Sequence, residues 1–179
     1  MKKLNKYLLY SLIYLIAMAG IYIYDAGRQV DVAIYSQNSK DSNTGEILAG
    51  TLITQEFTTN GEEISSIDLT FATYGRKNKG NLIVTIKDGN DESKVLKDFT
   101  VDLKAIKDNV PYRLNTDLQN SYGDKILIEI TSDVTDKNNA VTVWYNSSTT
   151  NHPLYINGEK INGELMFNIN VEARKGLRL

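Results

Sequence analysis

The sequence predicts an all-β fold, an antiparallel β-sandwich or jelly roll, preceded by one N-terminal transmembrane helix. Three observations predict it: an uncharged apolar run near the N-terminus, apolar–polar alternation along five later segments, and turn residues between those segments. Alternation with a period of two is typical of antiparallel strands that have one face in a core and the other in water.

The apolar run, Tyr7–Tyr24, has 18 residues without a charge, the lower end of the length that spans a membrane as a helix. Three lysines precede it and an aspartate follows, so the positive-inside rule predicts a cytoplasmic N-terminus and an extracytoplasmic C-terminal domain. A signal peptide cleaved at Ala17-Met18-Ala19 is the alternative, and a buried core helix is a third. The apolar run continues beyond that cut, which favours a single-pass anchor in the cell membrane.

The alternating segments are rich in β-branched and aromatic residues, which suit a pleated sheet. They are 67–74, 82–87, 126–131, 141–145 and 165–172. Turn sequences separate the strands at Asn60-Gly61, Asn78-Lys79-Gly80, Asp88-Gly89-Asn90-Asp91, Tyr122-Gly123-Asp124, Asn157-Gly158 and Asn162-Gly163. The alternation places Phe71, Ile128 and Phe167 in one core, and a short helical turn is predicted near Leu103–Ile106.

These patterns predict four parts of the chain. Residues 1–6 are a basic cytoplasmic tail, and residues 7–24 are the anchor. Residues 25–45 are a polar tether with an edge strand at Gln29–Tyr35. Residues 46–175 form the sandwich.

Composition excludes several classes of function. There is no cysteine, so thiol chemistry, a Cys/His triad and lipoprotein anchoring are excluded. The single histidine, His152, argues against a transition-metal site. The net charge of −2 divides into +3 on residues 1–24 and −5 on the rest, which offers no footprint for nucleic acid. No phosphate-binding loop or nucleophile elbow is present, and the carboxylates are scattered. We expect no catalytic residues, hence a protein that is not an enzyme.

The run Asp88-Gly89-Asn90-Asp91-Glu92 is similar to the start of a calcium loop but lacks the later glycine and glutamate that such a loop requires. A hairpin turn explains it better. We therefore predict neither a cofactor nor a metal site, with a structural calcium ion elsewhere in the sandwich as the alternative.

Tyr74, Arg76, Asn78 and Trp144 are the candidate ligand-binding residues. Tyr74 and Trp144 follow the outward parity of their strands, while Arg76 and Asn78 lie in the adjoining turn. Aromatic rings stack on sugars, and planar polar groups bond to sugar hydroxyls. The competing interpretation is structural: Trp144 fills a strand end and the Tyr74–Arg76 pair braces the turn, since aromatic residues on strands more often pack than bind.

The chain from residue 46 onward resembles the extracytoplasmic β-sandwich modules of bacterial envelope proteins, including glycosyltransferase-like proteins of surface-polysaccharide systems. The resemblance covers about two thirds of the chain and rests on Gln55-Glu56-Phe57, 71–78, Gly80-Asn81-Leu82, Lys107-Asp108-Asn109, 138–144 and 162–167. It implies a galactose-binding-like sandwich, a fold that hosts binding and scaffolding alike. Those relatives carry a multi-spanning transferase body, whereas one apolar segment is present here, so transferase activity is not carried over.

The expected function is therefore a non-catalytic module that binds a cell-envelope glycan or acts as a scaffold beside a polysaccharide-handling complex. A protein-interaction subunit, whose Tyr-rich helix contacts a membrane-protein partner, is the main alternative. A carbohydrate-active enzyme is the remaining one.

Overall fold

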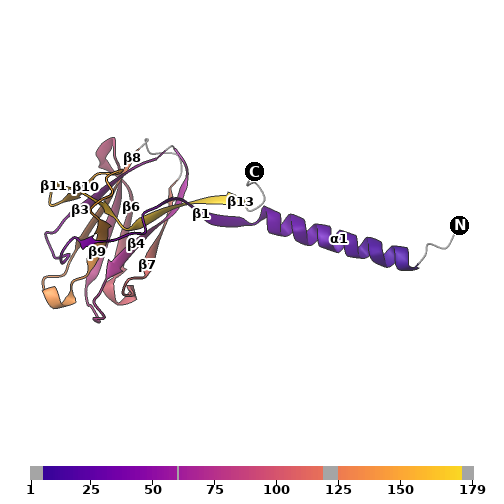
Figure 1. The fold of residues 1–179 in the computed structure, drawn as a ribbon, viewed down its shortest axis with the longest axis horizontal. Helices are drawn as coiled ribbons and strands as arrows, with labels where there is room; N and C mark the ends of the chain where they lie inside the picture. The colour runs from indigo at the N-terminus through magenta and orange to yellow at the C-terminus, as the bar shows by residue number, and fades with distance from the viewer. Residues whose placement is uncertain (1–5, 60, 119–124, 175–179) are drawn as a thin grey trace. The chain divides into compact units, whose positions relative to one another are not determined.

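The computed structural model describes residues 6–59, 61–118 and 125–174 of the chain. Residues 1–5 of the expected tail, residue 60, the expected turn at 122–124 and residue 175 lie outside the described residues. The chain begins with a helix, α1 (Lys6–Gly27), and is otherwise built from strands (Figure 1). The strands are β1 (Gln29–Ser36), β2 (Ser42–Asn43), β3 (Ile53–Thr58), β4 (Ile64–Ala72), β5 (Asn81–Asp88), β6 (Asp91–Asp102), β7 (Pro111–Leu118), β8 (Lys125–Ser132), β9 (Thr142–Asn146), β10 (Leu154–Ile156), β11 (Glu159–Ile161), β12 (Glu164–Leu165) and β13 (Phe167–Arg174).

Helix α1 is long and apolar enough to cross a membrane. Its 22 residues, at 1.5 Å each, extend about 33 Å, which exceeds the roughly 30 Å of a hydrocarbon core. None of its residues is buried in the protein. The predicted apolar helix is therefore confirmed as a helix of spanning length.

The strands form two antiparallel sheets, which confirms the predicted all-β sandwich. Within the described residues, one sheet has seven strands in the order β1-β13-β4-β9-β12, with β2 paired to β9 and β7 paired to β4. The other has six strands in the order β11-β10-β3-β8-β5-β6. Along β5, buried and more exposed residues alternate as the period-two pattern requires.

The core lies between the two sheets. Phe71, Ile128 and Phe167 are all buried in the same apolar cluster, as the alternation predicts. The ring of Phe167 lies 5.4 Å from that of Tyr35 and 6.0 Å from that of Phe57, measured between centroids. Aromatic packing therefore joins β13 to β1 and β3.

The polar segment 36–45, expected as part of a tether, lies instead against the sandwich. The Asp41 N–H donates to the Tyr145 carbonyl at 3.2 Å, and the Thr44 N–H donates to the Val143 carbonyl at 3.1 Å. Backbone hydrogen bonds of this kind do not depend on the type of side chain. A run of Ser, Asn and Asp can therefore join a sheet without an alternating apolar pattern in its sequence. The unit that contains the sandwich accordingly begins at Ala33.

Three connections cross between the sheets at one end of the sandwich. The registers of β4 with β7 and β9, and of β5 with β6 and β8, bring loops 73–80, 103–110 and 133–141 together there. The second loop contains a 3-10 turn, η1 (Leu103–Ala105), which confirms the predicted helical turn, and the third contains η2 (Lys137–Asn139). In Figure 1, η2 is the orange helical turn at the lower edge.

Candidate functional site

The first crossover, 73–80, opens with a tight turn. The Arg76 N–H donates to the Thr73 carbonyl at 3.1 Å, and the two central residues, Tyr74 and Gly75, have φ values of 55° and 69°. Two positive φ angles in succession are typical of a type I′ turn. The turn reverses the chain directly after β4 and points it toward the other sheet.

Asp108, from the second crossover, fixes this turn. Its Oδ1 accepts from the Thr73 N–H at 2.6 Å, the Thr73 hydroxyl at 3.1 Å and the Tyr74 N–H at 2.8 Å, while its Oδ2 accepts from the Asn109 side chain at 2.8 Å. These donors, the Thr73 N–H first among them, hold the pKa of Asp108 below its ordinary value. The carboxylate is thus ionised and has four donors within the protein.

Arg76 and Asn78 tie the first crossover to the third. Arg76 Nη2 donates to the Ala140 carbonyl at 2.6 Å, and Asn78 Nδ2 donates to the same oxygen at 3.1 Å. Gly80 allows the close approach: its φ is 111°, and a Cβ there would lie 2.5 Å from Val134 Cγ2. The three crossovers therefore form one hydrogen-bonded assembly.

A cleft of about 630 Å³ lies between the first and second crossovers. Leu103 and Ile106, both buried, supply its apolar lining, and Thr73, Arg76, Asn78 and Asp108 supply hydrogen-bonding groups. Ligand pockets typically have volumes of about 300–1,000 Å³ and combine apolar lining with a few placed polar groups. The cleft has that size and composition.

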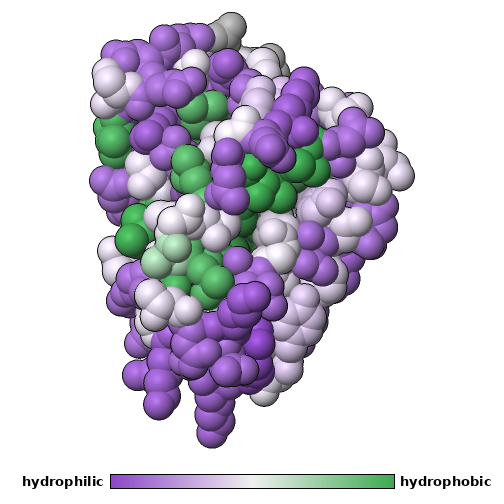
Figure 2. All heavy atoms as spheres, turned by 90° about the vertical axis from the view of Figure 1, so that its left-hand side faces the viewer, coloured by the Kyte–Doolittle hydropathy of each residue, from purple (hydrophilic) through white to green (hydrophobic). Residues whose placement is uncertain are grey.

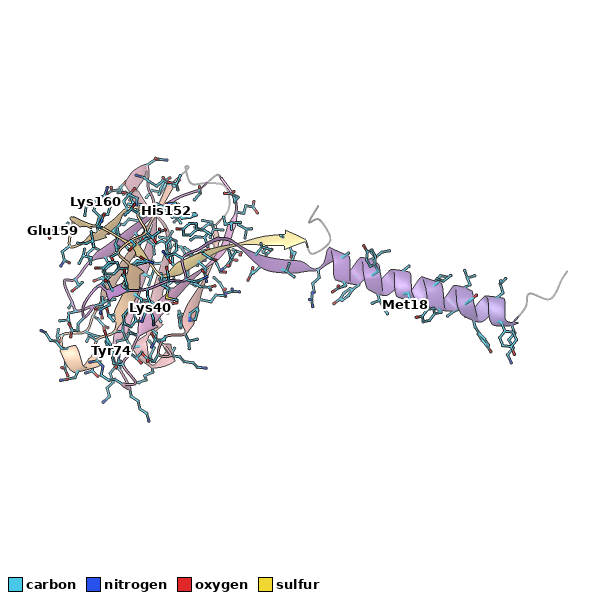
Figure 3. All side chains as sticks on the ribbon, in the orientation of Figure 1. Met18, Lys40, Tyr74, His152, Glu159 and Lys160 are labelled. Atoms are coloured by element: carbon cyan, nitrogen blue, oxygen red, sulfur yellow. The ribbon has the colours of Figure 1, made fainter. Side chains whose placement is uncertain are left out.

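Lysines surround the cleft. Lys77, Lys79, Lys104 and Lys107 all line it, and all four are exposed. Across the described chain none of these four ammonium groups lies in an ion pair with a carboxylate. Figure 2 shows that hydrophilic residues dominate the lower end of the visible face, the end at which Figure 3 labels Tyr74.

Three of the four sequence-predicted binding residues lie around this cleft. Arg76 and Asn78 line it, and Tyr74 lies with Arg76 in a smaller neighbouring cleft of about 260 Å³. β4 ends at Ala72, so Tyr74 belongs to the turn and not to the outward face of a strand. Tyr74 is 55% exposed, and the Arg76 guanidinium lies 5.3 Å from its ring centroid.

Asn78 is one of the predicted binding residues, but it is 1% exposed. The third crossover packs over it through the bond to Ala140, a contact that the local turn sequence cannot reveal. Its Oδ1 is buried and accepts no hydrogen bond from any described residue. One acceptor of this buried side chain thus has no donor among the described residues.

Trp144 is held apart from the cleft by its own contacts. Its Nε1–H donates to Asn109 Oδ1 at 2.7 Å, and the Lys40 ammonium lies 4.2 Å from the ring centroid. Lys40 also donates to Asn109 Oδ1 at 2.6 Å. One face of the indole is therefore covered by a cation, an arrangement that braces the segment before β2 against β9.

Most of the cleft, including its two apolar residues and its four lysines, is not predicted from the sequence. The signal that could have found the lysines is their spacing, two in 77–79 and two in 104–107, within a body of net negative charge. Their convergence depends on the pairing of β5 with β6, which sequence spacing alone does not specify.

A second polar cluster lies inside the sandwich. Glu164 is 0% exposed; the Tyr35 hydroxyl donates to its Oε1, and its Oε2 has no partner among the described residues. Burial raises the pKa of Glu164 above its ordinary 4.5 and raises the pKa of Tyr35 to about 12. His152 lies beside Tyr35 and Phe57, with ring centroids 4.9 and 4.7 Å away, and burial lowers its pKa. Figure 3 shows His152 well away from Tyr74.

The run that starts at Asp88 forms the expected hairpin. Asp88 accepts from the Asn90 N–H at 3.0 Å and pairs with Lys94 at 3.2 Å, and Asp91 accepts from the Ser93 N–H at 3.1 Å. Among the described residues, no group of three or more His, Cys, Asp or Glu side chains is placed to hold a metal ion.

The chain matches no protein-family model, and it matches no curated protein.

Proposed function

We propose that this chain is a non-catalytic glycan-binding module, held at the outer side of a bacterial cell membrane by α1. The observation that carries the proposal is the cleft between crossovers 73–80 and 103–110. A sugar ring presents apolar C–H faces and a rim of hydroxyls. Leu103 and Ile106 suit the faces, while Arg76 and the four lysines suit the rim.

The chemistry of the cleft supports binding without catalysis. Glycoside hydrolysis uses two carboxyl groups on either side of the scissile bond. Among the described residues that line the cleft, Asp108 is the one carboxylate. Its lowered pKa and its four internal donors suit a structural anchor for the turn and not a proton donor.

The test is retention of the purified full chain, in nonionic detergent, on envelope polysaccharide freed of protein by protease treatment. We expect retention on this material equal to that on untreated envelopes, because the cleft recognises the glycan itself. Retention on untreated envelopes that is lost after protease treatment would contradict the proposal and identify a protein partner.

Topology gives a second prediction. Three lysines before the span predict that the sandwich lies outside. Protease added to intact protoplasts should therefore digest the sandwich while a cytoplasmic marker survives. Protection of the sandwich until the membrane is broken would reverse the orientation and remove an extracytoplasmic glycan as ligand.

One observation favours the second candidate, a subunit that contacts other membrane proteins. Tyr7, Tyr10 and Tyr14 have i, i+3 and i+7 spacing, so they lie on one face of α1. Hydroxyl groups along one face of a membrane helix can bond to a neighbouring helix. The retention experiment separates this function from glycan binding, because a helix partner is removed by protease and a polysaccharide is not.

A further inference from the structure

We infer that the cleft selects an anionic glycan, one whose sugars carry carboxylate or phosphate groups. The inference rests on the glycan-binding function proposed above and names the chemical class of the ligand. It is carried by the charge around the cleft and by the apolar residues that line it.

Positive charge is concentrated around the cleft. Five cations line the cleft, Arg76 with Lys77, Lys79, Lys104 and Lys107, against the single carboxylate of Asp108. The rest of the chain after residue 24 is net negative, so this charge is local and opposite in sign to its surroundings. Several ammonium groups around one cavity repel one another, and a bound anion relieves that repulsion.

The protein does not neutralise the four lysines of the cleft with carboxylates of its own. Asp108 bonds to the Thr73 and Tyr74 backbone, and no ion pair joins it to any of the four lysines. Lys87, Lys94 and Lys125, elsewhere on the same sandwich, each pair with a carboxylate within 2.8–3.3 Å. The cleft lysines therefore keep their donors for an external anion.

The apolar lining of the cleft favours a sugar over a bare anion. The cleft also contains Leu103 and Ile106, whose apolar side chains make no favourable contact with a small inorganic anion. Such side chains suit the C–H face of a sugar ring. A sugar ring that bears a negative group therefore satisfies both the apolar lining and the unpaired lysines.

The experiment is calorimetric titration of the full chain in nonionic detergent with matched probes. Oligogalacturonate carries carboxylates, and its methyl ester is the neutral form of the same chain. Phosphomannan and neutral mannan form the corresponding phosphate pair, and inorganic polyphosphate is an anion without sugar. We expect at least one anionic glycan to bind about tenfold or more tightly than its neutral partner, with affinity that falls as salt rises.

The variants assign that binding to the cleft. Lys104→Gln with Lys107→Gln should weaken the anionic probe about tenfold or more. The matched control, Lys97→Gln with Lys160→Gln, removes the same charge from β6 and β11 and should change affinity by less than about twofold. Equal losses in both double variants would mean that net charge, and not the cleft, attracts the probe, and would overturn the inference.

Three other outcomes distinguish selectivity for anionic glycans from the proposed function, glycan binding itself. Equal binding of neutral and anionic glycans would overturn anion selectivity and leave glycan binding in place. Polyphosphate that binds as tightly as the anionic glycan would overturn recognition of the sugar. Failure of every glycan to bind would overturn both the inference and the proposed function.

Discussion

Phe167→Ala is expected to lower the free energy of unfolding by about 3–5 kcal/mol. Phe167 is 1% exposed and packs against Tyr35 and Phe57 between the sheets. Removing the ring loses its apolar burial and leaves a cavity that neighbouring β-strands cannot close, because backbone hydrogen bonds fix their spacing.

The measurement is a denaturant melt of the full chain in detergent, followed by the fluorescence of Trp144, the single tryptophan. Val95→Ala on β6 is the control: its side chain is 48% exposed, so its unfolding free energy should change by less than about 0.5 kcal/mol. A loss below about 1 kcal/mol for Phe167→Ala would contradict the central place of this ring in the core.

Glu164→Gln is expected to stabilise the protein above neutral pH, by about 1 kcal/mol or more at pH 8. Burial raises the pKa of Glu164 above 4.5, so the folded chain holds this proton more tightly than the unfolded chain. The stabilisation from the neutral acid is complete below pH 4.5 and is lost as the pH rises through the folded pKa. Glutamine keeps an acceptor for the Tyr35 hydroxyl and carries no charge to bury.

The protonation of His152 changes stability with pH in the opposite direction, and its effect must be separated from that of Glu164. Burial lowers its pKa below 6.5, so its contribution to stability is present above pH 6.5 and is lost as the pH falls. Because both proteins contain His152, the difference between their stabilities at each pH isolates Glu164. That difference should grow from pH 4 to pH 8, whereas Glu159→Gln, an exposed change on β11, should alter stability by less than about 0.5 kcal/mol. A constant difference for Glu164→Gln would refute the role assigned to its burial.

Sequence alone predicts the strands well, because side chains that alternate between core and water leave a period of two. The inward residues of β4, β8 and β13 follow this pattern and meet in one core. The pattern carries no information about segment 36–45, which contacts β9 through backbone groups and polar side chains. A polar segment in a sheet and a polar linker therefore look alike in sequence.

The candidate site is predicted less completely, for a related reason. The sequence identifies Arg76 and Asn78 as polar residues close to Tyr74, and both line the cleft. The residues opposite them, Lys104 and Ile106, come from a different crossover, about 28 positions later in the chain. The antiparallel registers of β5 with β6 and of β4 with β7 bring the two loops together, and the bond to Ala140 then buries Asn78.

The first and last strands of the sandwich, β1 and β13, are neighbours in one sheet, and the Gln37 N–H donates to the Phe167 carbonyl at 2.9 Å where they meet. A domain that the polypeptide enters and leaves along the same edge can be inserted into a surface loop of a larger host without stretching either partner. It also accepts circular permutation. Joining the ends of β1 and β13 and reopening the chain at the Asn157-Gly158 turn would create a version of the sandwich that needs no N-terminal helix to begin it.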